Sequence, residues 1–150
     1  MARIRDIVID ALEPPVLARF WEAALDGYTV RPYDEAEIAR LAAMGRTPET
    51  DPSVALDGPG PTIWLQETAE PKVSRNRFHF DLVGGPRAVE VERLCALGAT
   101  VRDEHDTYSV LRDPEGNEFC VRDPEECPGR AGGRADPPRT RYRPRSKRAE

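Results

Sequence analysis

Apolar and polar residues alternate along residues 4–10, as they do in a strand with one buried face. A helix is predicted to follow, because Pro14 and Pro15 suit a first helical turn. Its apolar stripe has helical spacing and consists of Leu17, Phe20, Trp21, Ala24 and Leu25. Residues 28–33, 51–56 and 62–67 predict three more strands, and residues 34–45 predict a short extra helix with an acidic first turn.

The same order recurs in the second half of the chain. Residues 77–83 predict a strand, and apolar positions among residues 89–97 predict a helix that stops at Gly98. Three strands are then expected over residues 101–104, 108–112 and 118–122, with a turn at 113–117, DPEGN, between the last two. The chain is therefore predicted to contain two βαβββ modules, over about residues 4–70 and 75–123.

The predicted strand 77–83 places a histidine among apolar neighbours. By alternation, Phe78, Phe80 and Leu82 face the core, whereas His79 and Asp81 face the opposite side. An imidazole titrates near neutral pH and can transfer protons. Three interpretations of His79 stay open: a hydrogen-bonded pocket residue, a ligand-contacting or acid–base group, and a metal ligand.

Other candidate site residues lie on neighbouring strands. Trp64 shares a face with Gln66, where its ring could stack on a flat ligand or close the pocket floor. Glu118 and Cys120 share the inward face of the last strand, and Cys120 is interpreted as a small buried residue rather than a reactive thiol. Trp21 lies on the apolar helical stripe and is predicted to be core.

Charge is distributed unevenly along the chain. Residues 129–150 contain eight Arg or Lys and two Asp or Glu, which leaves 14 basic and 25 acidic residues in residues 1–128. The basic segment is rich in Gly and Pro, so we expect a disordered tail, at most in weak contact with RNA or an acidic surface. An acidic body argues against a nucleic-acid reader.

The sequence lacks the patterns of membrane-spanning, secreted and disulfide-rich proteins. The sequence has no apolar run near the roughly 18 residues of a membrane span and no signal-peptide pattern, so a cytoplasmic protein without a membrane partner is expected. The three cysteines form no CxxC pair, which argues against a disulfide framework or a zinc knuckle. Cys95, within a predicted helix, is expected in the core.

The doubled βαβββ order resembles the vicinal-oxygen-chelate superfamily, which includes glyoxalase I, extradiol dioxygenases and bleomycin-resistance proteins. The segments RNRFHFDL, LRDPEGNEFCV, ARFWEAALDGY and TPETDPSVAL are similar to its glyoxalase-like branch, over about residues 4–122. The resemblance implies an α+β fold within residues 1–128, in which curved mixed sheets surround a cleft and helices lie outside. It also implies a homodimer.

In metal-dependent relatives, four inward side chains bind a metal that chelates two substrate oxygens. The resemblance transfers these positions to Asp6, Gln66, His79 and Cys120. Gln is a weak neutral ligand and Cys a soft one that prefers zinc or copper, so a site without metal is favoured over an occupied one. Glu118 and Asp81 also point inward and offer substitute ligands.

The resemblance implies a protein that binds a small molecule. The first prediction is a metal-poor or metal-independent lyase or isomerase, with His79 as the catalytic residue and a substrate contacted by Trp64, Gln66, Asp81 and Glu118. The alternative is sequestration of an aromatic or drug-like ligand, as in bleomycin-resistance relatives. An acidic body would help to hold a cationic ligand.

Overall fold

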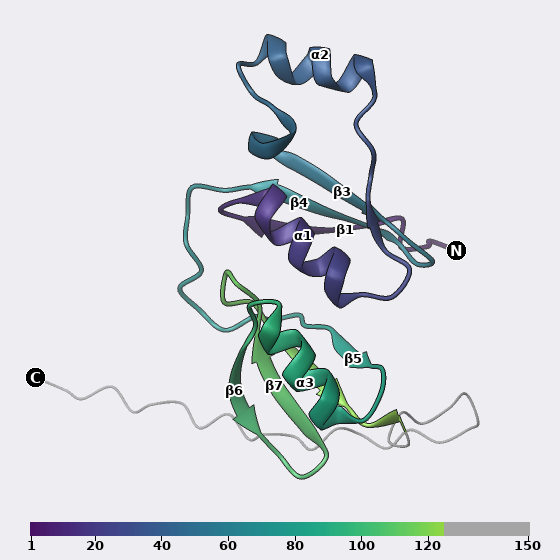
Figure 1. Ribbon diagram of the computed structural model, residues 1–150, viewed down its shortest axis with the longest axis vertical. Helices are drawn as coiled ribbons and strands as arrows, with labels where there is room; N and C mark the ends of the chain where they lie inside the picture. The colour runs from purple at the N-terminus through teal and green to yellow at the C-terminus, as the bar shows by residue number, and fades with distance from the viewer. Residues whose placement is uncertain (125–150) are drawn as a thin grey trace, which may run out of the picture.

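The computed structural model describes residues 1–124, which form two four-stranded sheets, each crossed by a helix (Figure 1). The strand orders are β1-β4-β3-β2 and β5-β8-β7-β6. In each sheet the first pair of strands is parallel and the other pairs are antiparallel. The α+β class and the doubled βαβββ order are confirmed, and the two sheets do not close into one barrel. The expectations for the basic tail concern residues outside those described.

The two modules divide the helices and strands between them. The first module contains β1 (Asp6–Ala11), α1 (Pro14–Ala24), β2 (Thr29–Val30), α2 (Glu35–Ala43), the 3₁₀ helix η1 (Pro48–Thr50), β3 (Ser53–Asp57) and β4 (Thr62–Glu67). The second module contains β5 (Asp81–Val83), α3 (Arg87–Ala96), β6 (Thr100–Glu104), β7 (Tyr108–Arg112) and β8 (Glu118–Arg122). Within residues 1–124, no helix combines the length and apolar character needed to cross a membrane.

Helix α1 packs against its own sheet in the first module and also against the second module. Trp21 is buried, as predicted, and its ring meets Phe20, Phe80 and Phe119 edge-to-face at centroid distances of 5.2, 5.4 and 5.3 Å. Such aromatic contacts add to the apolar area they bury. Because Phe80 and Phe119 belong to the second module, the two modules share one core.

Both ends of α1 are bonded to side chains of the second module. The Glu115 carboxylate accepts hydrogen bonds from Leu12 N (2.7 Å) and Glu13 N (2.9 Å), just before the helix begins. At the other end, the Arg93 guanidinium donates to Ala23 O (2.8 Å) and Ala24 O (3.1 Å). A negative group at the N-terminus and a positive one at the C-terminus both complement the helix dipole. These contacts fix α1 relative to the second sheet.

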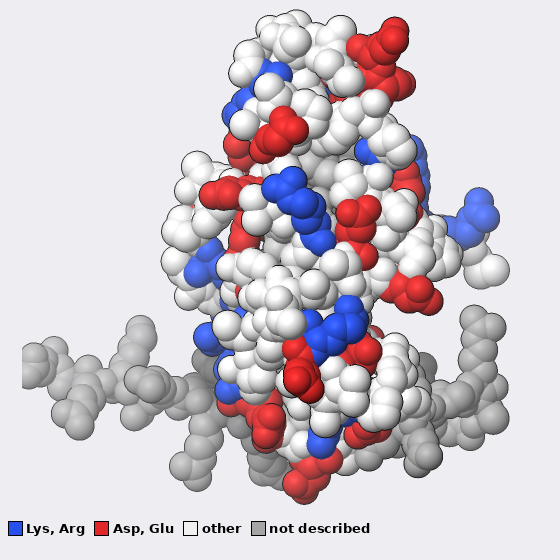
Figure 2. Space-filling model, in the orientation of Figure 1, with Lys and Arg blue, Asp and Glu red and all other residues white. Residues whose placement is uncertain are grey.

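The extra helix α2 lies at the end of the molecule farthest from the second module (Figure 1). It begins where predicted, because the Asp34 side chain accepts a hydrogen bond from Glu37 N (2.8 Å) and caps the first turn. Only Leu41 of this helix is fully buried. Acidic side chains lie at one end of α2 and basic side chains at the other, and charges of both signs mix over the rest of the visible face (Figure 2).

Two predicted strands are reduced to two or three residues in the structure. The strand expected over 77–83 spans only Asp81–Val83, and Phe78 is 65% exposed instead of buried. The hydrogen-bond ladder between β5 and β8 reaches back only to Phe80, whose carbonyl accepts from Cys120 N (2.8 Å). Farther back, Asn76 N donates to the Glu118 side chain instead. The strand expected over 28–33 covers only Thr29–Val30, since Pro32 has no N–H to continue the ladder.

The burial of Cys95 and of helix α3 differs from expectation. Cys95 is partly buried and packs against the core rather than lying within it. On α3 only Leu94 is fully buried, whereas Val89 remains largely exposed. Arg93 and Glu90 form an ion pair of 2.8 Å on the flank of α3.

Candidate functional site

Each sheet has one face packed on a helix and one open face. On β4, Trp64 and Gln66 point to the open face, between residues that are buried against α1. On β8, Glu118 and Cys120 likewise point away from the shared core. Trp64 and Gln66 are accessible on their open face, whereas Glu118 and Cys120 are buried on theirs, at 8% and 6% exposure.

Strand register separates two members of the metal-ligand set implied by the resemblance. Asp6 pairs with Thr62, whereas Gln66 pairs with Asp10. Asp6 and Gln66 thus lie four positions apart along parallel strands, or about 13 Å at 3.3 Å per residue. The structure brings His79 and Cys120 together but does not bring Asp6 beside Gln66.

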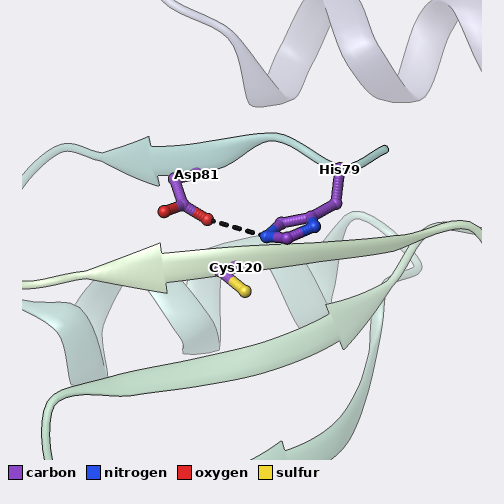
Figure 3. Close-up of side chains that lie close together, drawn as sticks. All are labelled: His79, Asp81 and Cys120. Carbon is purple, nitrogen blue, oxygen red and sulfur yellow. Dashed lines mark ion pairs between the residues drawn. The ribbon is translucent and has the colours of Figure 1, made fainter. Parts of the chain in front are cut away.

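A different cluster forms where β5 meets β8. Ligand atoms of His79, Asp81 and Cys120 lie within 4.8 Å of one another. Figure 3 shows His79 and Asp81 projecting from the same segment toward Cys120 on the neighbouring strand. His79 Nε2 is 3.3 Å from Asp81 Oδ1, and Asp81 pairs directly with Cys120 in the ladder. The His79 side chain is 46% exposed, so it remains accessible from solvent.

The carboxylate of Asp81 is held from two sides. Arg122 Nε donates to Asp81 Oδ2 at 3.0 Å, while Asp81 Oδ1 faces His79. Arg122 is itself positioned over the ring of Tyr108, 5.0 Å from its centroid. This chain of contacts orients the carboxylate and, through it, the imidazole.

Cys120 is a protonated thiol at neutral pH. Burial raises the pKa of this thiol to about 11, and the charge and hydrogen bond of Asp81 act in the same direction, against Arg122. The residue is only 6% exposed. Because the thiolate is the reactive form, Cys120 lacks the properties of a catalytic nucleophile.

Glu118 anchors the segment that connects the modules. Its carboxylate accepts from Asn76 N (2.9 Å) and contacts Lys72 Nζ (3.0 Å) and Arg102 (3.5 Å). Burial disfavours its ionisation, but the bonds from Asn76 and Lys72 outweigh burial and keep the pKa of Glu118 below its ordinary value. Its side chain is thus engaged by the protein, while its predicted contact with substrate stays a prediction.

Trp64 lines a separate cavity of about 440 Å³ beneath α2. Sequence patterns did not single out its other polar walls, Arg31, Tyr33, Arg40 and Asp51. These residues come mainly from loops and from the inserted helix, where neither strand nor helix periodicity marks an inward side. The extra helix predicted over residues 34–45 contributes Ala36, Glu37 and Arg40 to this cavity.

The ligand chemistry near His79 suits a metal only in part. The four-residue set implied by the resemblance does not assemble, whereas the nitrogen, oxygen and sulfur donors of His79, Asp81 and Cys120 match the ligand types of Zn²⁺. These three residues would hold such an ion, and it would act as a Lewis acid on a substrate oxygen. The expectation from the sequence, which favours a site without metal, stays a prediction.

The chain matches a known protein family. A family model for the glyoxalase-like domain matches residues 6–122. A search among curated proteins gave no significant match.

Solved structures share the fold at low sequence identity. A glyoxalase/bleomycin resistance protein/dioxygenase family enzyme from Burkholderia phytofirmans PsJN matches with a TM-score of 0.58 and 16% identity, over 81% of this chain and 98% of its own. Fosfomycin resistance protein FosX from Mesorhizobium loti matches with a TM-score of 0.58 and 12% identity, over 81% and 91%. Together with the family match, the doubled βαβββ fold shows that the chain belongs to the glyoxalase-like domain family of the vicinal-oxygen-chelate superfamily.

Proposed function

We propose that this protein is a metal-independent lyase or isomerase that acts on a small oxygenated metabolite, with His79 as the proton-transferring residue. The observation that carries the proposal is the pair of His79 Nε2 and Asp81 Oδ1, 3.3 Å apart on an accessible face. A carboxylate that orients an imidazole is a recurring acid–base arrangement. The substrate would meet the imidazole from the solvent side of the sheet.

His79 and Asp81 have different roles in this proposal. In this proposal Nε2 of His79 carries the imidazole proton, 3.3 Å from Asp81 Oδ1, and Nδ1 is the acceptor for a substrate proton. The Asp81 carboxylate then stabilises the imidazolium, and Arg122 keeps that carboxylate in place. Cys120 stays a neutral thiol beneath the pair, so no covalent intermediate on sulfur is required.

Deuterium exchange tests this function even when the final product is not identified. Small hydroxy- and keto-acids are incubated with protein in D₂O, and loss of C–H signals is followed by NMR. His79→Gln should reduce exchange by about 10²- to 10⁴-fold, the range for a positioned acid–base group. His105→Gln, which alters the chain's other histidine, is the matched control. Equal exchange by wild type and His79→Gln would refute the catalytic role.

A second candidate function is sequestration of an aromatic ligand without turnover. It is favoured by the cavity beneath α2, because Trp64 offers a ring for stacking there. Binding of a flat compound with no chemical change to it, measured by calorimetry and mass spectrometry, would support this function. Absence of binding by every flat compound tested would contradict it.

A further inference from the structure

The cavity beneath α2 is built separately from the His79 cluster. Its floor is the open face of β3 and β4, including Ala55 and Trp64, and its roof includes Ala36 and Arg40 of α2. None of the residues lining it belongs to β5 or β8. The cavity therefore offers a second binding surface on the first module.

A planar cation already lies on the aromatic wall of this cavity. The guanidinium carbon of Arg31 is 5.1 Å from the ring centroid of Trp64, within the range of a cation–π contact. The same guanidinium forms two hydrogen bonds of 2.7 Å with Asp57. The arrangement thus recognises a flat positive group through one ring and one carboxylate. Because the Arg31–Asp57 pair is about half exposed, solvent screens it, and a ligand that supplies its own cation–π contact can compete for Trp64.

Negative charge predominates around the cavity. Three carboxylates line it, those of Asp34, Glu37 and Asp51, against the two guanidinium groups of Arg31 and Arg40. A further carboxylate, that of Asp57, pairs with Arg31 from beside the cavity. Arg40 is engaged by Glu37 through bonds of 2.9 and 2.6 Å. An anionic ligand would therefore meet arginines that are already neutralised and an excess of carboxylates.

Asp51 supplies the deepest of these charges. It is 2% exposed and accepts hydrogen bonds from Tyr33 Oη (3.0 Å) and Ser53 N (2.9 Å), whereas the nearest Arg40 nitrogen is 4.0 Å away. Burial and the Asp51 hydrogen bond raise the pKa of Tyr33, so its phenol stays neutral and does not add a second charge. Asp51 therefore attracts a cation from inside the cavity.

We propose that the cavity beneath α2 binds a flat aromatic cation, which stacks on Trp64 in place of the Arg31 guanidinium. The proposal names the ligand class for the second candidate function, sequestration of an aromatic ligand. It rests on that function in one respect, that the cavity accepts a flat ligand. It is independent of proton transfer by His79.

A charge series of one ring system tests the ligand class. The probes are 9-aminoacridine, which is cationic at neutral pH, 9-anthracenemethanol, which is neutral, and anthracene-9-carboxylate. Binding to the full chain is measured by probe fluorescence and calorimetry at low and high salt. The cation should bind most tightly, and its affinity should fall with salt. Equal or tighter binding of the carboxylate would overturn the proposal.

Two substitutions test the stacking position. Trp64→Ala should weaken 9-aminoacridine binding roughly threefold to thirtyfold, the range of a cation–π contact. Arg31→Ala should strengthen it roughly twofold to fivefold, because the internal competitor is removed and Asp57 is released. The matched control is Arg46→Ala, which breaks a similar two-bond pair with Glu67 away from the cavity lining and should leave affinity unchanged.

The outcomes separate the two proposals. Weaker binding by Arg31→Ala would show that Arg31 is an anchor rather than a competitor, and would overturn the inference. Tight binding of the neutral or anionic probe would leave sequestration standing but remove the cationic ligand class. If none of the three probes binds, both the inference and the sequestration function fail. Thermal unfolding of each variant confirms that the fold is intact.

Discussion

Cys120 should ionise about two pH units above an ordinary thiol, and Asp81 should be one cause of the difference. Its pKa is raised from 9.0 to about 11, first by burial and then by the charge and hydrogen bond of Asp81. A shift of two units lowers the thiolate fraction at neutral pH about 100-fold. Asp81→Asn removes the charge but not the burial, so the pKa of Cys120 should fall only part of the way to 9.0.

The assay is the pH dependence of alkylation in a chain with a single thiol. Cys95→Ser and Cys127→Ser leave Cys120 alone, and the rate of reaction with iodoacetamide is followed by mass spectrometry from neutral to strongly alkaline pH. Poor access lowers the plateau rate, whereas the midpoint of the curve reports the pKa. The midpoint should lie near pH 11 when this single-thiol protein retains Asp81, and lower when it also carries Asp81→Asn.

The same shift predicts how stability depends on pH. The folded thiol binds its proton more tightly than the unfolded thiol, so its contribution is fully present below about pH 9 and is lost as pH rises through about 11. Two units correspond to at most about 3 kcal/mol of unfolding free energy. Cys120→Ala should flatten this part of the stability curve, as measured by chemical denaturation.

A midpoint near pH 9 that does not respond to Asp81→Asn would refute this reasoning. It would mean that Asp81 and burial do not protect the proton of Cys120. A nucleophilic role for the thiol would then have to be considered in place of acid–base chemistry by His79.

Three further predictions address the cluster and the links between modules. Zinc should inhibit the deuterium exchange that depends on His79, because a metal on its imidazole removes the proton acceptor; activation by zinc would contradict a metal-independent reaction. Glu118→Gln should lower unfolding free energy by about 1 kcal/mol and speed hydrogen exchange of residues 72–77, which its carboxylate holds. Glu115→Ala should cost about 1–2 kcal/mol in chemical denaturation, since two amides before α1 lose their acceptor; an unchanged midpoint would argue against this cap.

The sequence alone was sufficient for the features that depend on local pattern. The apolar stripe of α1 predicted a buried Trp21, and alternation placed Trp64 and Gln66 on one face of a strand. The cap at Asp34 marked the start of α2. These features follow from helix and strand periods and from capping chemistry, which act over a few residues.

Strand length and the convergence of the site were decided by tertiary structure. Alternation puts His79 and Asp81 on one side, but only the register of β5 against β8 brings Cys120 to them. Register likewise separates Asp6 from Gln66, and Asn76 N, just before the predicted strand 77–83, donates to the Glu118 carboxylate.

The cavity beneath α2 shows the same limit. Its walls come from loops, an inserted helix and two strands, and no local period relates Arg31, Asp51 and Trp64. Their meeting depends on how distant segments pack. The sequence therefore determined the fold class and the inward candidates, whereas long-range pairing and loop packing determined which of them form a site, because those contacts join residues with no shared local pattern.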